Sequence, residues 1–174
     1  MSKAQLKKEL STFTGQQLVE VVLNVYSASK EAREYLEFFL NPDVDKLFDK
    51  TVLAITKELQ RSKRNYSKAR ISRIRSAITG FANYGIGYEY VGKLMLRTII
   101  LIIVEYNYVH FTATLVNGLR KLVNDYINMA QSNNDLSSAL ANLDEIVNNE
   151  KLGARTLRDF VRTCVDDSLK NLKS

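Results

Sequence analysis

Apolar residues recur at three- and four-residue intervals along almost the whole chain, and only one proline and seven glycines interrupt its 174 residues. This spacing places apolar side chains on one face of an α-helix, whereas a half-buried strand needs alternation of apolar and polar residues. No window alternates in that way between turn signals. We therefore predict an all-α fold of about eight or nine helices, packed as an irregular bundle or a short superhelical array, with no sheet.

The length of the chain favours a single helical domain over residues 1–174, with a weak candidate boundary at residues 60–67. A chain of this size buries roughly 70% of its unfolded surface on folding. Its apolar content of 45% is ordinary for a globular protein. The chain therefore needs neither a disulfide nor a metal ion to hold its core.

Capping signals place several of the helices. Thr14 and Gln17 have the spacing of a capping box. Asn41 is expected to cap the helix that begins at Pro42, because asparagine is a favoured N-cap residue and proline is tolerated at the first helical position. Together with the periodicity, these signals predict helices at about residues 3–12, 68–84, 88–106 and 112–129, helices beginning after Thr14, Ser29 and Asn41, and two more that carry residues 136–147 and 157–169.

The helix at residues 88–106 differs from the others, because it is apolar almost all round between Leu94 and Val104. A helix of this kind is expected to be central and buried. Gly85-Ile86-Gly87 precedes it and is expected to end the helix at residues 68–84, since glycine accepts the left-handed conformation of a C-cap.

Positive charge is concentrated in one stretch of the chain. The net charge of +6 lies in residues 1–87, and no acidic residue occurs between Glu58 and Glu89. Such basic runs are typical of surfaces that bind nucleic acid or another polyanion. Ser67 could cap a helix that begins at Lys68, and the N–H groups at that end would favour an anion. The candidate polyanion-binding residues are Arg61, Lys63, Arg64, Ser67, Lys68, Arg70, Arg73 and Arg75.

A helical wheel offers a second interpretation of the same stretch, a solvated loop and helix face. At 100° per residue, Lys68 and Arg75 flank the apolar stripe on one side, and Arg70 and Arg73 flank it on the other. Long basic side chains are placed in this way when they cover the apolar edges of a helix. Both interpretations stay open.

The chemistry-bearing residues assign no catalytic, cofactor-binding or metal-binding site. His110 is the only histidine and Cys164 is the only cysteine, so neither a catalytic triad nor a set of zinc ligands is present. Cys164 falls in an apolar stripe, where cysteine behaves as a small hydrophobe. Glu105 closes the apolar helix and, if buried, would need a partner such as Arg97 or a tyrosine hydroxyl. We expect no cofactor and no enzymatic activity.

The chain shows no sign of export or membrane insertion. Its longest unbroken apolar run, Ile99 to Val104, is much shorter than the about 20 residues of a membrane-spanning helix. The first residues lack the apolar core of a signal peptide, and a single cysteine allows no intrachain disulfide. We expect a cytoplasmic protein without a membrane span.

Several short motifs occur in the order and spacing of a known family. They are Tyr35 to Pro42 (YLEFFLNP), Lys46-Leu47, Ile55 to Glu58 (ITKE), Lys68 to Ser72 (KARIS) and Lys93 to Leu96 (KLML). In these motifs the chain resembles a family of small bacterial all-helical proteins catalogued as a domain of unknown function, over most of residues 1–105. The resemblance implies a bacterial, cytoplasmic origin, and it supplies no activity or site residue.

Three classes of function follow. The first is a non-enzymatic binding module that uses the basic patch at residues 61–75 to contact nucleic acid or another polyanion. The alternative is a protein–protein interaction scaffold or a homo-oligomeric structural protein, which would expose an apolar patch. An enzyme with a carboxylate-based site ranks last, because the sequence contains no catalytic motif.

Overall fold

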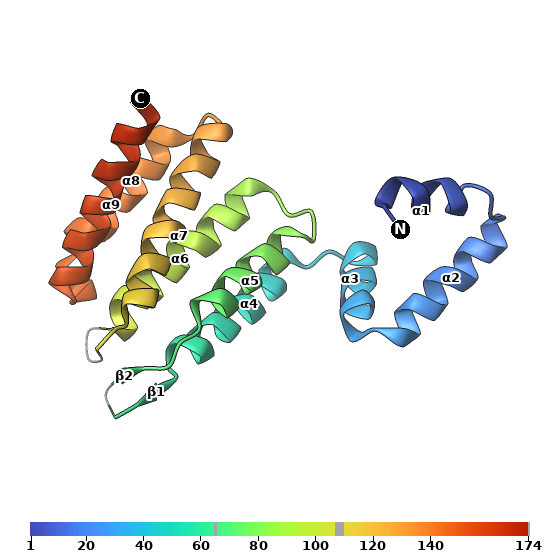
Figure 1. Cartoon of the computed structure of the whole chain (residues 1–174), viewed down its shortest axis with the longest axis horizontal. Helices are drawn as coiled ribbons and strands as arrows, with labels where there is room; N and C mark the ends of the chain where they lie inside the picture. The colour runs from blue at the N-terminus through green and yellow to red at the C-terminus, as the bar shows by residue number, and fades with distance from the viewer. Residues whose placement is uncertain (65, 107–109, 174) are drawn as a thin grey trace. The chain divides into compact units, whose positions relative to one another are not determined.

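The computed structural model describes residues 1–64, 66–106 and 110–173. In this part of the chain nine α-helices account for most residues, which confirms the all-α prediction. The chain divides into two compact units, residues 1–43 and residues 44–174. Residues 60–67, the candidate boundary, lie inside the larger unit. The elements are coloured along the chain in Figure 1.

Three helices make up residues 1–43: α1 (Lys3–Leu10), α2 (Gly15–Ala28) and α3 (Lys30–Leu40). Ser2 and Thr14 form complete capping boxes at the starts of α1 and α2, as the spacing of Thr14 and Gln17 predicts. Ser29 caps α3 by accepting a hydrogen bond from the N–H of Ala32 at 3.2 Å. Local capping interactions therefore stabilise all three helices of residues 1–43.

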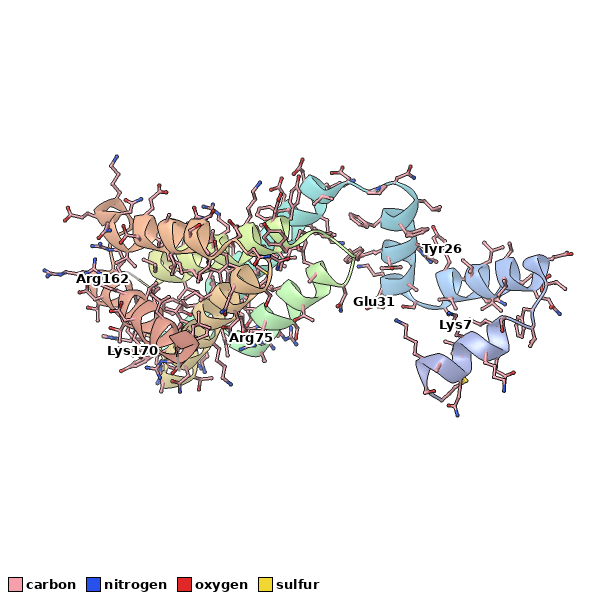
Figure 2. All side chains as sticks on the ribbon, turned by 90° about the horizontal axis from the view of Figure 1, so that it is seen from above. Lys7, Tyr26, Glu31, Arg75, Arg162 and Lys170 are labelled. Atoms are coloured by element: carbon pink, nitrogen blue, oxygen red, sulfur yellow. The ribbon has the colours of Figure 1, made fainter. Side chains whose placement is uncertain are left out.

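Polar contacts at the surface join α2 to α3. The Tyr26 hydroxyl donates to Glu37 Oε1 at 2.9 Å, and the Arg33 guanidinium lies 5.2 Å from the centre of the Tyr26 ring. Figure 2 labels Tyr26 among the side chains of this unit. The hydrogen bond to Glu37 and burial both raise the pKa of Tyr26. None of the residues of α1, α2 or α3 is buried. The smaller unit thus has defined helices and no core.

Residues 44–174 contain the remaining elements and the whole hydrophobic core. The core gathers around α6, whose Leu94, Ile99 and Ile103 have none of their surface exposed. The prediction of a buried central helix is confirmed, since α6 packs against α4, α5, α7 and α8. The elements are α4 (Val44–Leu59), β1 (Ser62–Lys63), β2 (Tyr66–Ser67), α5 (Ile71–Ala82), α6 (Tyr88–Glu105), α7 (Ala113–Ser132), α8 (Leu136–Asn148), a short 3₁₀ helix (Glu150–Leu152) and α9 (Arg155–Lys173).

A glycine on α7 determines how closely α5 and α7 pack together. Gly118 on α7 faces Ile71 at the start of α5, and a Cβ atom added at Gly118 would overlap the Ile71 side chain. Leu115, Leu119 and Leu122 continue this buried face of α7, in the register that the sequence predicts. The absence of a side chain at residue 118 therefore lets the two helices pack closely.

Two predictions about element boundaries are wrong. Residues 62–63 and 66–67 form two paired antiparallel strands in place of a loop, so the described chain is not free of sheet. Asn41 does not cap the next helix: it is the C-cap residue of α3, and α4 begins only at Val44. Both errors fall where a few polar residues connect two helices and allow more than one local conformation.

The expected helix end at Gly85-Ile86-Gly87 is close to the observed one. Helix α5 stops at Ala82, and Gly85 has a φ of +76°, in the left-handed region that glycine adopts without strain. Within the described residues, no helix combines the length and the apolar character needed to span a membrane.

Candidate functional site

The basic stretch is organised by the hairpin of β1 and β2. Ser62 pairs with Ser67 and Lys63 pairs with Tyr66. The N–H of Lys68 donates to the carbonyl oxygen of Arg61 at 2.6 Å, which closes the base of the hairpin. Arg64 turns the chain with a φ of +53°, a conformation that side chains other than glycine adopt at a cost. Lys63, at the end of β1, and Arg64, which follows it, are both exposed to solvent.

Ser67 anchors the hairpin to the body of the unit. Its side chain is only 8% exposed, and its hydroxyl is hydrogen-bonded to the hydroxyl of Tyr106 at the end of α6. Burial raises the pKa of Tyr106, and the bond to Ser67 opposes that rise. The prediction that Ser67 caps α5 is wrong: α5 begins at Ile71, with Arg70 as an N-cap residue that makes no side-chain capping bond. Ser67 is thus a structural residue and presents little surface to a ligand.

Glu58 neutralises two of the candidate cations. The guanidinium of Arg70 donates to both carboxylate oxygens of Glu58, at 3.0 and 2.9 Å, and the backbone N–H of Arg70 donates to Oε1 at 2.9 Å. Arg61 Nε lies 3.7 Å from the same carboxylate. These bonds, chiefly the one from the Arg70 side chain, lower the pKa of Glu58 to about 2. Arg70 therefore holds the start of α5 to the end of α4, whereas Arg61 makes a local contact with the last turn of α4.

Arg75 also has an acidic partner. Its guanidinium donates to Asp125 Oδ2 on α7 at 2.7 Å. The pair lies in a polar hollow of about 780 Å³ between α5 and α7, which Lys121 and Asn128 also line. Arg75 thus contacts a different surface from the hairpin.

The four other cations of the stretch are exposed, and within the described residues they have no carboxylate partner. Lys63 and Arg64 lie at the hairpin, Lys68 follows it, and Arg73 lies on the first turns of α5. The structure thus separates the eight candidate residues into a buried serine, three cations in ion pairs and four exposed cations. The basic side chains are therefore partly dispersed over the surface. This agrees with the helical wheel, which places them on both flanks of the apolar stripe.

Two aromatic side chains complete the hairpin surface, and the sequence analysis missed both. The ring of Tyr66 packs on the ring of His110, with centroids 5.5 Å apart and planes at 37°. The N–H of Ser67 donates to the carbonyl oxygen of His110 at 3.0 Å. Tyr66 is 60% exposed and His110 is also exposed. The position of Tyr66 inside the basic run was a usable signal, whereas no sequence pattern brings residue 110 to the hairpin.

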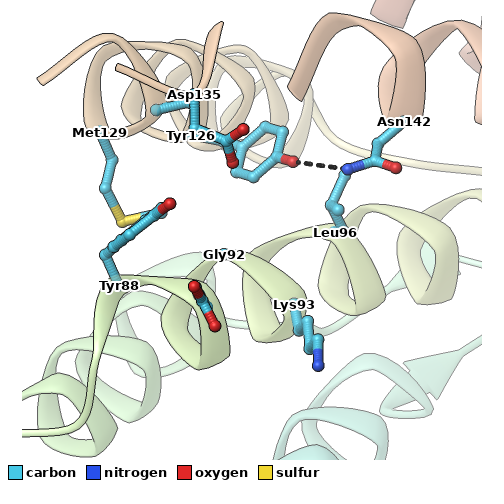
Figure 3. A pocket seen from close by; sticks show the side chains of 10 residues that line it. Tyr88, Gly92, Lys93, Leu96, Tyr126, Met129, Asp135 and Asn142 are labelled. Carbon is cyan, nitrogen blue, oxygen red and sulfur yellow. Dashed lines mark hydrogen bonds between the residues drawn. The ribbon is translucent and has the colours of Figure 1, made fainter. Parts of the chain in front are cut away.

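A hollow of about 310 Å³ lies between α6, α7 and the start of α8 (Figure 3). The Tyr126 hydroxyl there accepts a hydrogen bond from Asn142 Nδ2 at 3.3 Å. Burial raises the pKa of Tyr126, and the bond to Asn142 opposes that rise. The acidic side chains at its edge are Glu89, which is exposed, and Asp135, which is half-buried. The hollow therefore does not offer the paired buried carboxylates that acid–base catalysis on a bound substrate favours.

The other residues singled out by the sequence occupy structural positions. Cys164 is buried, and burial raises the pKa of its thiol. Glu105 accepts a hydrogen bond from Gln60 Nε2 at 3.2 Å, so its observed partner is neither Arg97 nor a tyrosine hydroxyl. Within the described residues, no group of three or more His, Cys, Asp or Glu side chains is arranged to hold a metal ion.

Fold and surface together define an all-α protein with an exposed basic and aromatic hairpin. The chain belongs to a family of unknown function (DUF6155), whose family model matches residues 1–153. No curated protein and no solved structure matches the chain. The resemblance in the Tyr35–Pro42, Lys68–Ser72 and Lys93–Leu96 motifs to an uncharacterised family is thereby confirmed.

Proposed function

We propose that the protein binds a phosphate-rich polymer, single-stranded nucleic acid, at a hairpin surface formed by Lys63, Arg64, Tyr66, Lys68 and His110. The observation that carries the proposal is the exposed pair of adjacent Tyr66 and His110 rings beside three exposed cations that have no carboxylate partner within the described residues. Cations bind phosphates, and exposed aromatic rings stack on unpaired bases.

Single strands fit this surface better than a duplex does. Reading a duplex usually requires a helix or a β-ribbon long enough to enter the major groove. The hairpin has strands of two residues each, and among the described residues one aromatic pair lies at it. Unpaired bases stack on aromatic rings with about 1 to 3 kcal/mol per base, largely regardless of sequence. The expected ligand is therefore a single strand bound with little sequence preference.

The test is fluorescence anisotropy of labelled single- and double-stranded oligonucleotides over about 50 to 200 mM salt. The informative variant combines Lys63→Gln, Arg64→Gln and Lys68→Gln. Arg70 is left intact, because its loss would expose Glu58 and disturb α4 and α5. A matched control combines Lys151→Gln, Arg155→Gln and Lys170→Gln, three exposed cations elsewhere in residues 44–174.

We expect the hairpin variant to bind single strands at least ~10-fold more weakly and with a smaller salt slope, since it releases fewer counterions. The control should bind like the natural sequence. Tyr66→Ala should weaken single-strand binding while the salt slope stays unchanged. Equal affinity of both triple variants, or no binding at low salt by the folded protein, would contradict the proposal.

A second candidate function is protein interaction or self-assembly, and a different observation favours it. Of the fifteen large hydrophobic side chains that are exposed among the described residues, eleven lie in residues 1–43. Apolar surface on this scale is typical of interaction sites.

We also propose a cytoplasmic location for the protein. The single cysteine supports it, because proteins of oxidising compartments commonly carry disulfides.

A further inference from the structure

Helix α2 carries the broadest exposed apolar surface of residues 1–43. Leu18, Val22 and Val25 form one stripe at helical spacing, and Val19 and Leu23 form the stripe beside it. These five side chains are between 36% and 58% exposed. Glu20 and Asn24 lie on the other side of the helix. Helix α2 therefore has an apolar face wide enough to be covered by another helix.

Local capping interactions stabilise α2, which carries this apolar face, and its neighbours α1 and α3. Complete capping boxes begin α1 and α2, and Ser29 caps α3. Short helices are nevertheless marginal in water unless an apolar face is buried. No residue of the three helices is buried, and the only cysteine lies in α9, so no disulfide can hold the unit together. The apolar face requires a covering partner.

A groove between α1 and α2 shows what that partner would contact. It has a volume of about 680 Å³, and Leu6, Leu10 and Leu18 supply apolar side chains to it. Lys3 and Lys7 also line it and add positive charge. An occupant that fits this groove is an amphipathic helix with apolar side chains flanked by carboxylates.

Helix α3 has these properties. Tyr35 and Phe39 are 44% and 69% exposed and, with Glu31, follow one another at four-residue spacing on one face of the helix. Glu34 lies on the neighbouring stripe, where its carboxylate is 3.9 Å from the Lys30 ammonium at the surface, so the contact with a second copy would share this charge. Leu40, the last residue of α3, is 73% exposed. The same short unit thus carries both a groove lined by lysines and an acidic, apolar helix.

We propose that residues 1–43 dock on residues 1–43 of a second copy, with α3 of each copy in the α1–α2 groove of the other. A two-fold axis makes every contact reciprocal, so both grooves are filled and Lys3 and Lys7 of each copy meet Glu31 and Glu34 of the other. An interface of standard size takes about 800 Å² from each partner. Residues 1–43 offer eleven large apolar side chains, each at least 36% exposed, to such an interface. The inference rests on the second candidate function and is independent of the hairpin.

The first experiment is sedimentation velocity of the full chain and of two variants of α2. Leu18→Lys places a charge in the α1–α2 groove, and Asn24→Lys places the same charge on the polar side of the same helix. Both residues are exposed, so neither substitution removes a core contact. We expect a dimer for the natural sequence and for Asn24→Lys, and at least ~10-fold weaker dimerisation for Leu18→Lys, because the dimer would bury the new charge among the apolar side chains of the groove.

A charge exchange tests the arrangement of the helices. The double variant Lys3→Glu, Lys7→Glu should dimerise more weakly, and so should Glu31→Lys, Glu34→Lys. A mixture of the two double variants should form a heterodimer with restored affinity, because opposite charges meet again. Failure of the mixture to associate better than either variant alone would overturn the proposed α3-in-groove contact.

A monomer at every concentration would overturn self-association, and the binding of a hydrophobic dye then separates two cases. Dye that binds the natural sequence strongly and Leu18→Lys weakly would show an accessible apolar groove, which leaves the protein-interaction function with a different partner. Weak dye binding by both would show that the groove is not accessible, and the second candidate function would fail as well.

Discussion

Residues 1–43 and residues 44–174 both consist mainly of helices with periodic apolar residues, but they differ in whether those apolar side chains are buried. All 26 buried hydrophobic residues among the described residues lie in the larger unit, and none lies in the smaller one. The periodicity of apolar residues is nevertheless as clear in α2 as in α7. Periodicity therefore shows which face of a helix must be covered, and it does not show whether the same chain covers it.

The largest expected effect contrasts one leucine from each region. Leu143 on α8 has none of its surface exposed, whereas Leu23 on α2 is 58% exposed. Leu143→Ala should lower the free energy of unfolding by about 2 to 5 kcal/mol, because it leaves a cavity in the core. Leu23→Ala should change it by about 0.5 kcal/mol or less at concentrations where the chain is monomeric. Urea unfolding of both variants measures the difference, and equal losses would remove the contrast between the regions.

Glycine-to-alanine substitutions provide a smaller contrast. At Gly118 the added Cβ would overlap Ile71, so Gly118→Ala should cost about 1 to 3 kcal/mol through the separation of α5 from α7. At Gly15, the first residue of α2, no atom lies within 4 Å of the added Cβ. Gly15→Ala should leave stability within about 0.5 kcal/mol of the natural sequence. Thermal unfolding of the two variants checks this prediction, which a loss of similar size at both positions would contradict.

The Glu58–Arg70 pair predicts a dependence on pH that is confined to the larger unit. The pKa of Glu58 is lowered to about 2 by its bonds to Arg70, so ionised Glu58 stabilises the fold. This stabilisation is present above the ordinary glutamate pKa and is lost as the pH falls toward 2. After allowance for solvent screening it should be about 1 to 2 kcal/mol. Glu58→Gln should lack this part of the acid destabilisation in urea titrations between pH 6 and pH 2, and an identical pH profile would contradict the role of the pair.

The smallest expected effect is local to residues 1–43. Thr14→Ala removes the side chain that caps α2, at a cost of about 1 kcal/mol to that helix. Amide exchange should become faster in residues 15–28, while α6 keeps the exchange rates of the natural sequence. If exchange in α6 also becomes faster, the two regions unfold together and the comparison is wrong.

The sequence predicts those parts of the fold that depend on one segment at a time. The bounds of α6, the buried register of Leu115, Leu119 and Leu122, and the capping box at Thr14 all follow from local pattern. Their energetics are set by spacing along a single helix, so neighbouring elements are not needed to find them.

The sequence does not predict features that depend on two distant segments. Asp125 neutralises Arg75 from 50 residues away, and Tyr106 holds Ser67 from 39 residues away. His110 reaches Tyr66 in the same way. A count of charges along the chain therefore overestimates the exposed basic surface, and it misses the aromatic pair that makes the hairpin a candidate site.

The central claim is that residues 1–43 gain their stability from a second copy, whereas residues 44–174 are stable alone. Hydrogen–deuterium exchange of the full chain at about 1 to 100 µM protein tests it most directly, because only association makes stability depend on concentration. We predict that the amides of α2 become more protected as the concentration rises and that those of α6 do not change. Equal protection of α2 at every concentration would contradict the claim.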